Sequence, residues 1–207
     1  MPLIRSAAIT SDAAAETLEL RRDPLAGDEV DERRRAARAL SGDPAAASVL
    51  AALLADETDP RVRDTLFGSL IDIGGTRAAQ LLAPFLRSDD AGLRGGAIEA
   101  LKQLGSDAAL VLDALMSDPD TDVRILAIEI TRAWPSDLAV PRLRRVFENE
   151  SHVNVCAAAV DVATEVGTKE LLVALDGLRV RFGGEPFLVF AVDIACDRIH
   201  GNDARGA

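Results

Sequence analysis

One short pattern returns along the chain at nearly constant spacing, and it constrains the fold more than any other feature. In each copy an Asp precedes an apolar residue and an Arg, and the copies begin at Asp59, Asp90 and Asp120. The arginines of successive copies lie 31 and then 30 residues apart: Arg63, Arg94 and Arg124. A repeat of about 20 to 50 residues predicts a solenoid, in which each unit buries its apolar face only by stacking on its neighbours.

Each copy has the signals that begin and end an α-helix. The Asp stands at an N-cap position, where its carboxylate can accept hydrogen bonds from the free N–H groups of the first turn. Pro60 follows at the first helical position, where a missing N–H costs nothing. Apolar residues then recur every three or four positions, which marks one face of a helix. Gly74 and Gly105 end the first two helices, and Pro135 ends the third.

A second apolar segment follows every such helix, at residues 81–86, 110–116 and 138–147. Two helices in each repeat, joined by short links, form an antiparallel hairpin that is repeated along an axis. The sequence therefore predicts an all-α fold, an α-solenoid of about six antiparallel helical hairpins.

The repeat resembles a known family. Its D-x-x-V-R start, the small or Leu residues that follow and the terminal Gly are similar to the HEAT repeats, in particular to their short form in phycobilisome-lyase-like proteins. The resemblance implies that the Arg packs against acidic groups of its own and adjacent repeats. It also implies that the helix beginning at the Asp lines the concave face of the solenoid.

Composition and charge narrow the choice of partners. The chain of 207 residues is 48% hydrophobic, yet aromatic residues make up only 3% and Tyr is absent, which suits thin, closely stacked helices. A net charge of −11 disfavours nucleic acid, because affinity there depends on neutralising phosphates. No apolar run approaches the roughly 20 residues that span a bilayer, and no signal-peptide pattern is present. We expect no membrane partner and a cytoplasmic location.

The first forty residues are less regular than the rest. Residues 1–11 are expected to form a loose N-terminal tail, and residues 12–207 a single HEAT-like repeat domain. One helix is predicted from Ser11–Asp12 to Arg22 and another from Asp28 to Leu40, which carries Arg33 at the repeat position. The basic run that begins at Arg33 follows acidic residues, so it is most often a solvated helix face with ion pairs, and a binding role is the alternative.

The fifth copy and the end of the chain depart from the pattern. His152 stands where the Asp cap should be, and Cys156 stands where the Arg should be. Because the series of arginines stops there, stacking in the last third is expected to differ in detail. Glu185 and Pro186 begin a last helix, whose spaced apolar residues are Phe187, Phe190, Ile194 and Ile199.

The two Cys and two His form two pairs with the spacing of metal ligands, His152 with Cys156 and Cys196 with His200. Corresponding helices of successive hairpins run parallel. A pair at the start of one helix and a pair at the end of the next would therefore lie roughly 20 Å apart, at about 1.5 Å per residue. We expect a cap substitute, two core thiols and a terminal His rather than a metal site, a disulfide or any cofactor. A shared metal site is the alternative.

No catalytic set is recognisable. The sequence shows no Ser/His/Asp or Cys/His arrangement and no Gly-rich loop after a strand. Some HEAT-repeat hydroxylases use His-Glu pairs as iron ligands, but neither His152 nor His200 is followed by Glu. The DNA-glycosylase relatives of the fold would need a basic groove with aromatic residues, and the only Trp, Trp134, matches core positions of the repeat. The sequence predicts a protein without enzymatic activity.

The exposed side of the helices that begin at the Asp is the remaining candidate. Six residues after the leading Val or Leu of each copy stand Gly68, Glu99, Glu129 and Asp161, and four further on stand Asp72, Gln103, Ala133 and Glu165. On a concave face these residues would form an acidic stripe from the third repeat to the fifth, although polar residues could simply face water. One position before the stripe, apolar residues are expected to add contact area for a partner: Phe67, Ile98, Ile128 and Val160.

The candidate partner-binding residues are Asp64, Phe67, Asp72, Glu99, Gln103, Glu129, Arg132, Asp161 and Glu165. They predict a protein-binding scaffold, adaptor or assembly chaperone that uses the concave face of an α-solenoid and binds another protein with a basic patch. The alternative, by likeness to the bilin lyases, is an accessory factor that helps to attach a bilin or a metal to a carrier protein.

Overall fold

The structure is a computed structural model that describes residues 27–206, with side chains described as far as residue 201. The expected tail of residues 1–11 and the helix expected from Ser11–Asp12 to Arg22 lie outside this part.

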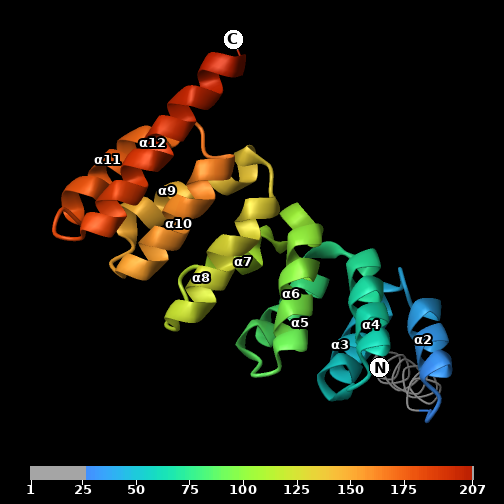
Figure 1. The fold of residues 1–207 in the computed structure, drawn as a ribbon. Helices are drawn as coiled ribbons and strands as arrows, with labels where there is room; N and C mark the ends of the chain where they lie inside the picture. The colour runs from blue at the N-terminus through green and yellow to red at the C-terminus, as the bar shows by residue number, and fades with distance from the viewer. Residues whose placement is uncertain (1–26, 207) are drawn as a thin grey trace, which may run out of the picture. The chain divides into compact units, whose positions relative to one another are not determined.

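All regular structure in the described residues is helical (Figure 1). The α-helices are α2 (Val30–Ala39), α3 (Ala47–Asp56), α4 (Pro60–Ile73), α5 (Gly75–Leu82), α6 (Ala91–Leu104), α7 (Ala109–Leu115), α8 (Thr121–Ile130), α9 (Ser136–Asn149), α10 (Val153–Val166), α11 (Leu172–Arg181) and α12 (Pro186–Gly206). Short 3-10 helices extend or join them: η2 (Pro44–Ala46), η3 (Ala83–Arg87), η4 (Gly105–Ala108), η5 (Thr131–Ala133) and η6 (Lys169–Leu171).

The helices form hairpins in chain order. Contacts join α3 with α4, α7 with α8, α9 with α10, and α11 with α12, and α5 and α6 follow one another at the corresponding place. We call the even-numbered helices the second helices, and α2 stands in the place of the second helix of one more hairpin. The predicted all-α class, an α-solenoid of helical hairpins, is confirmed. Five of the expected six or so hairpins lie in the described residues.

The chain divides into two compact units, residues 1–100 and residues 101–207. Unit 1 contains α2 to α5 and most of α6, and unit 2 contains the end of α6 and α7 to α12. Because α6 runs across the border, the division does not coincide with a linker. The single repeat domain expected for residues 12–207 stays a prediction.

The helix ends follow the chemistry read from the repeat. The carboxylates of Asp59, Asp90 and Asp120 each accept a hydrogen bond from the backbone N–H two residues on, at 2.9, 2.7 and 2.9 Å. Gly74 and Gly105 have φ angles of 67° and 53°, which favour glycine because it has no Cβ. The predicted caps and stops of these helices are confirmed.

The repeated arginines hold the start of each second helix to the segment before it. Their guanidinium groups each donate to the backbone carbonyl six residues earlier, at 2.6 to 2.9 Å. We call these residues the arginine ladder: Arg33, Arg63, Arg94 and Arg124. A buried carbonyl without a partner is costly, so each ladder arginine satisfies a backbone group that the short links leave free.

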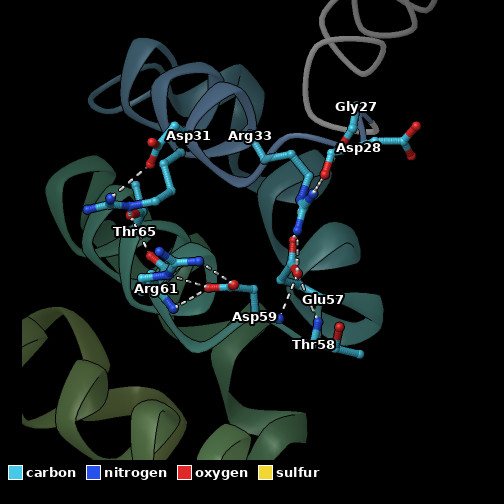
Figure 2. Close-up of polar contacts among 10 residues, drawn as sticks. Gly27, Asp28, Asp31, Arg33, Glu57, Thr58, Asp59, Arg61 and Thr65 are labelled. Atoms are coloured by element: carbon cyan, nitrogen blue, oxygen red, sulfur yellow. Dashed lines mark hydrogen bonds and ion pairs between the residues drawn. The ribbon is translucent and has the colours of Figure 1, made fainter.

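Three ladder arginines also reach a carboxylate further along the chain. Arg33 pairs with Glu57 at 2.9 Å, and Figure 2 shows this guanidinium between Glu57 and the backbone at Gly27 and Asp28. Arg63 pairs with Asp90 at 2.8 Å. Arg124 pairs in the same way with a later carboxylate, that of Glu150, at 2.8 Å. These contacts agree with the acidic partners that the HEAT resemblance implied.

The fifth repeat replaces the ladder in a way that the sequence did not reveal. The Cys156 thiol donates to the Glu150 carbonyl six residues earlier, at 3.6 Å. Arg181, at the end of α11, donates to the same carbonyl at 2.8 Å and also to the carbonyls of Phe147 and Glu148. A guanidinium from the next hairpin therefore makes the hydrogen bond to this carbonyl that a ladder arginine makes in the other repeats.

Each unit has its own apolar core. In unit 1 the second helices bury residues such as Leu66 and Leu70, and in unit 2 Leu101 has no exposed surface. Trp134 is 3% exposed, and its indole N–H donates to the Lys102 carbonyl at 3.2 Å. The structural role predicted for this Trp is confirmed.

Candidate protein-binding surface

The acidic residues predicted on α8 and α10 meet around one arginine in unit 2. Arg132, in η5, donates to Glu129 at 2.9 Å and to Asp161 at 2.7 Å, and it also pairs with Glu165. We call these four residues the Arg132 cluster. The structure thus brings together four of the nine candidate residues. The repeat spacing explains why, since α8 and α10 present equivalent positions side by side.

The Arg132 cluster carries surplus negative charge on its exposed side. Burial opposes the charge of Arg132, but hydrogen bonds to Asp161 and Glu129 outweigh it and hold the pKa of the guanidinium above its usual value. The side chains of Asp161 and Glu165 are 68% and 52% exposed, against 24% for Arg132. One guanidinium cannot neutralise three carboxylates. The cluster therefore presents negative charge to solvent over a partly buried positive centre.

Asp64 and Asp72 lie on the corresponding side of unit 1, in different surroundings. Both line an open hollow of about 340 Å³ between α2 and α4, and Asp72 accepts a hydrogen bond from the Ser41 hydroxyl at 2.5 Å. The same hollow is lined by basic residues: Arg34, Arg38 and Arg61. The unit 1 surface is therefore mixed in charge, which the acidic stripe did not anticipate.

The prediction that apolar residues beside the stripe are accessible to a partner is wrong for most of them. Phe67 is 6% exposed, and Ile128 and Val160 have no exposed surface, so a partner cannot reach them. The Phe67 ring packs on Gly96 of the next second helix, where an added Cβ would lie 2.1 Å from a ring carbon. Residues at this position face the neighbouring repeat. Phe67 therefore belongs to the core, and we remove it from the candidate site.

Glu99 and Gln103 of α6 are both exposed, as predicted. Glu99 belongs to unit 1, whereas Gln103 and the Arg132 cluster belong to unit 2. A continuous acidic stripe from the third repeat to the fifth stays a prediction.

The two cysteines differ in burial, and both histidines are exposed. Cys156 is buried and Cys196 is half-buried, and both are free cysteines. Burial raises the pKa of the Cys156 thiol to about 11. The His200 ring contacts the Cys196 carbonyl through Nδ1 at 2.7 Å. Within residues 27–201 no three His, Cys, Asp or Glu side chains gather in a group that could hold a metal ion.

Helix α12 holds a feature that the sequence misplaced. The sequence predicts Phe187, Phe190 and Ile194 on the same apolar face as Ile199, but they are 51%, 67% and 42% exposed. The buried face of α12 consists instead of Leu188, Val192, Ala195 and Ile199. The signal was available in the repeat register, because Leu188 matches the buried position of Val62 and Val155.

Comparison with known proteins agrees with the repeat. The family model described as HEAT repeats matches residues 18–102, so this stretch is similar to HEAT repeats. HEAT-repeat proteins are typically non-enzymatic. A fold of this kind generally supports protein–protein interaction. Comparison with curated proteins finds no significant match.

Among solved structures, three crystal structures of engineered proteins match the chain. One is 17% identical with a TM-score of 0.39 and covers 89% of this chain and 97% of its own. A second is 19% identical with a TM-score of 0.43, over 93% and 60% of the two chains. The third is 18% identical with a TM-score of 0.41, over 88% and 98%. Separately, none of the described helices combines the length and the apolar character needed to cross a membrane.

Proposed function

We propose that this protein is a non-enzymatic scaffold that binds another protein through the exposed side of its second helices, as an adaptor or assembly chaperone. The observation that carries the proposal is the Arg132 cluster, in which three carboxylates from two repeats share one guanidinium. The surplus negative charge destabilises this surface, because the carboxylates repel one another. An added cation would relieve repulsion among the carboxylates.

The partner is a protein with a basic patch. An incoming Lys or Arg would reach Asp161 and Glu165 first, because these are the most exposed carboxylates of the cluster. Arg132 keeps both side chains ordered, which lowers the entropy that binding must remove. The net charge of −11 would steer such a partner from a distance. Nothing in the matched family or in the described residues favours the cofactor-attachment alternative.

Affinity capture from extract of the native cell, with mass-spectrometric identification, tests the proposal. The wild-type protein is compared with a variant that removes three charges of the cluster, Glu129→Gln, Asp161→Asn and Glu165→Gln. A control removes three exposed charges from the first helices of the hairpins, Asp56→Asn, Asp137→Asn and Glu148→Gln. We expect the control to capture the same partner as the wild type and the cluster variant to lose it. Equal capture by all three proteins would remove the Arg132 cluster as the binding site.

A further inference from the structure

One set of positions can be used to compare the exposed sides of helices α4, α10 and α12. The carbonyl of Glu185 accepts from the N–H groups of Leu188 and Val189, as the Asp59 carbonyl does from Val62 and Arg63. Glu185 therefore corresponds to the N-cap residues Asp59 and His152. We call the residues two, five and nine positions after the N-cap the open row of a helix: Arg61, Asp64 and Gly68 in α4, Asn154, Ala157 and Asp161 in α10, and Phe187, Phe190 and Ile194 in α12.

The open row changes character in α12. In α4 and α10 it is polar or small, and in α10 it includes Asp161 of the Arg132 cluster. In α12 all three residues are large and apolar, and their exposed fractions are 51%, 67% and 42%. Helix α12 packs directly on α10 in unit 2, so its open row lies next to that of α10. An exposed apolar row of this kind is unusual on a surface that only faces water.

The apolar row is not the face that a following repeat would cover. The position that packs on the next repeat lies eight residues after the N-cap, where Phe67 meets Gly96. In α12 that position holds Asp193, which pairs with Arg179 of α11 at 3.3 Å. An ion pair there suits a surface exposed to water. One of the apolar residues, Ile194, stands at the position that carries Asp161 in α10.

Charges around the apolar row are mainly negative. Asp161 and Glu165 of the Arg132 cluster lie on α10, the helix on which α12 packs. On α12 itself, Asp193 is paired with Arg179, and Asp197 and Arg198 are exposed neighbours of opposite sign. The surplus charge beside the row therefore comes from α10. A partner that touches both helices would meet this charge.

We infer that the open row of α12 and the Arg132 cluster form one docking surface for a basic amphipathic helix of a partner protein. This inference rests on the proposed function and specifies its partner. Phe187 and Ile194 are seven residues apart, about 10 Å along the helix, which matches two turns of a bound helix. Apolar residues on one side of that helix pack on Phe187, Phe190 and Ile194, through anchors spaced three or four residues apart. Its Lys or Arg residues meet Asp161 and Glu165.

The test uses a defined probe, an 18-residue fluorescent peptide of Leu and Lys arranged as an amphipathic helix. A peptide of the same composition with the Leu residues scrambled is its control. Binding is measured by fluorescence anisotropy with the wild type, with Phe190→Ser/Ile194→Ser and with Val173→Ser/Val180→Ser. The second pair is a control that also replaces two exposed apolar residues, since Val173 and Val180 are 85% and 77% exposed on α11. Circular dichroism checks that each variant is folded.

We expect the amphipathic peptide to bind the wild type at least tenfold more tightly than the scrambled one. Phe190→Ser/Ile194→Ser should weaken binding at least tenfold, and Val173→Ser/Val180→Ser less than twofold. Equal binding of the two peptides, or equal effects of the two variants, would overturn the inference. So would light scattering that shows a wild-type dimer and a monomeric Phe190→Ser/Ile194→Ser variant, because the row would then serve a second copy of the chain.

The outcomes separate this inference from the proposed function. If the cluster variant loses its cellular partner while Phe190→Ser/Ile194→Ser keeps it, the Arg132 cluster binds without the apolar row, and only this inference fails. If the cluster variant keeps its partner, the proposed function fails first.

Discussion

A matched pair of neighbouring glycines in α6 tests the packing between repeats most sharply. Gly95 and Gly96 both lie inside the helix, but their surroundings differ. An added Cβ at Gly95 meets nothing within 4 Å, whereas at Gly96 it would lie 2.1, 2.5 and 2.7 Å from three carbons of the Phe67 ring. Carbon atoms in contact prefer about 3.5 to 4.0 Å. The Gly96→Ala change therefore forces the buried ring to move by more than an ångström.

The expected difference in stability comes from the one energy term that the two variants do not share. Replacing a helical Gly by Ala favours folding by up to about 1 kcal/mol at either position. Overpacking at Gly96 costs about 1 to 3 kcal/mol, because Phe67 is only 6% exposed and has little free space. The helix term cancels between the variants. Gly96→Ala should therefore be less stable than Gly95→Ala by about 1 to 3 kcal/mol.

Urea denaturation followed by circular dichroism measures the difference, and thermal unfolding should show it as about 2 to 4 °C for each kcal/mol. Replacing the ring by a smaller side chain, Phe67→Leu, should lower the free energy of unfolding less in the Gly96→Ala background than in the wild type. Such coupling is expected of residues in contact. Equal stability of the two alanine variants, within about 0.5 kcal/mol, would refute the packing of Phe67 on Gly96.

Three further predictions concern the core, a helix cap and a thiol. Leu101 has no exposed surface, so Leu101→Ala should lower the free energy of unfolding by about 2 to 5 kcal/mol, and a loss below about 0.5 in urea would place it outside the core. The hydrogen bond from Arg61 lowers the pKa of Asp59 from 3.8 to about 2. The ionised Asp59 therefore stabilises the folded state fully above the pKa of the unfolded chain, and this stabilisation is lost as the pH falls towards 2. Between these values the wild type should lose more stability than Asp59→Asn, and parallel acid-denaturation curves would contradict this. Because burial raises the pKa of Cys156 to about 11, iodoacetamide at neutral pH should leave this thiol unmodified until urea unfolds the protein, and rapid labelling of the native protein would contradict its burial.

Local chemistry made much of the fold predictable. Asp caps, terminal glycines and the spacing of apolar residues act within one helix, so they are visible in the sequence without knowledge of neighbours. The repeated position of Arg63 and its equivalents was visible in the spacing, and the resemblance to HEAT repeats implied their acidic partners. These features placed the starts of α4, α6 and α8 at the residues where the structure begins them.

The candidate surface was harder to predict, because it depends on which side of each helix faces the next repeat. Successive residues of a helix point about 100° apart, so Phe67 and Gly68 face different surroundings although they are adjacent. Periodicity marks the face that packs within a hairpin but does not separate the side towards the next repeat from the open side. Periodicity alone therefore places Phe67 on the partner-binding surface and puts the exposed Phe190 on the same face as the buried Ile199, and both predictions are wrong.

Contacts between side chains distant in sequence were outside the reach of local patterns. Arg181 replaces the ladder arginine at Cys156 only because α11 packs beside α9. Arg132 is among the residues that the sequence predicts. Its position between three carboxylates depends on the packing of α8 against α10, which local patterns do not show.

The salt dependence of binding tests the central claim most directly. The dissociation constant of the captured partner should be measured across a range of salt concentrations for the wild type, the cluster variant and the first-helix control. The account predicts that wild type and control bind tightly at low salt and weaken steeply as salt rises, whereas the Glu129→Gln/Asp161→Asn/Glu165→Gln variant binds weakly throughout with a flatter dependence. Identical dissociation constants and slopes for the wild type and this variant would contradict the claim that the Arg132 cluster binds the partner.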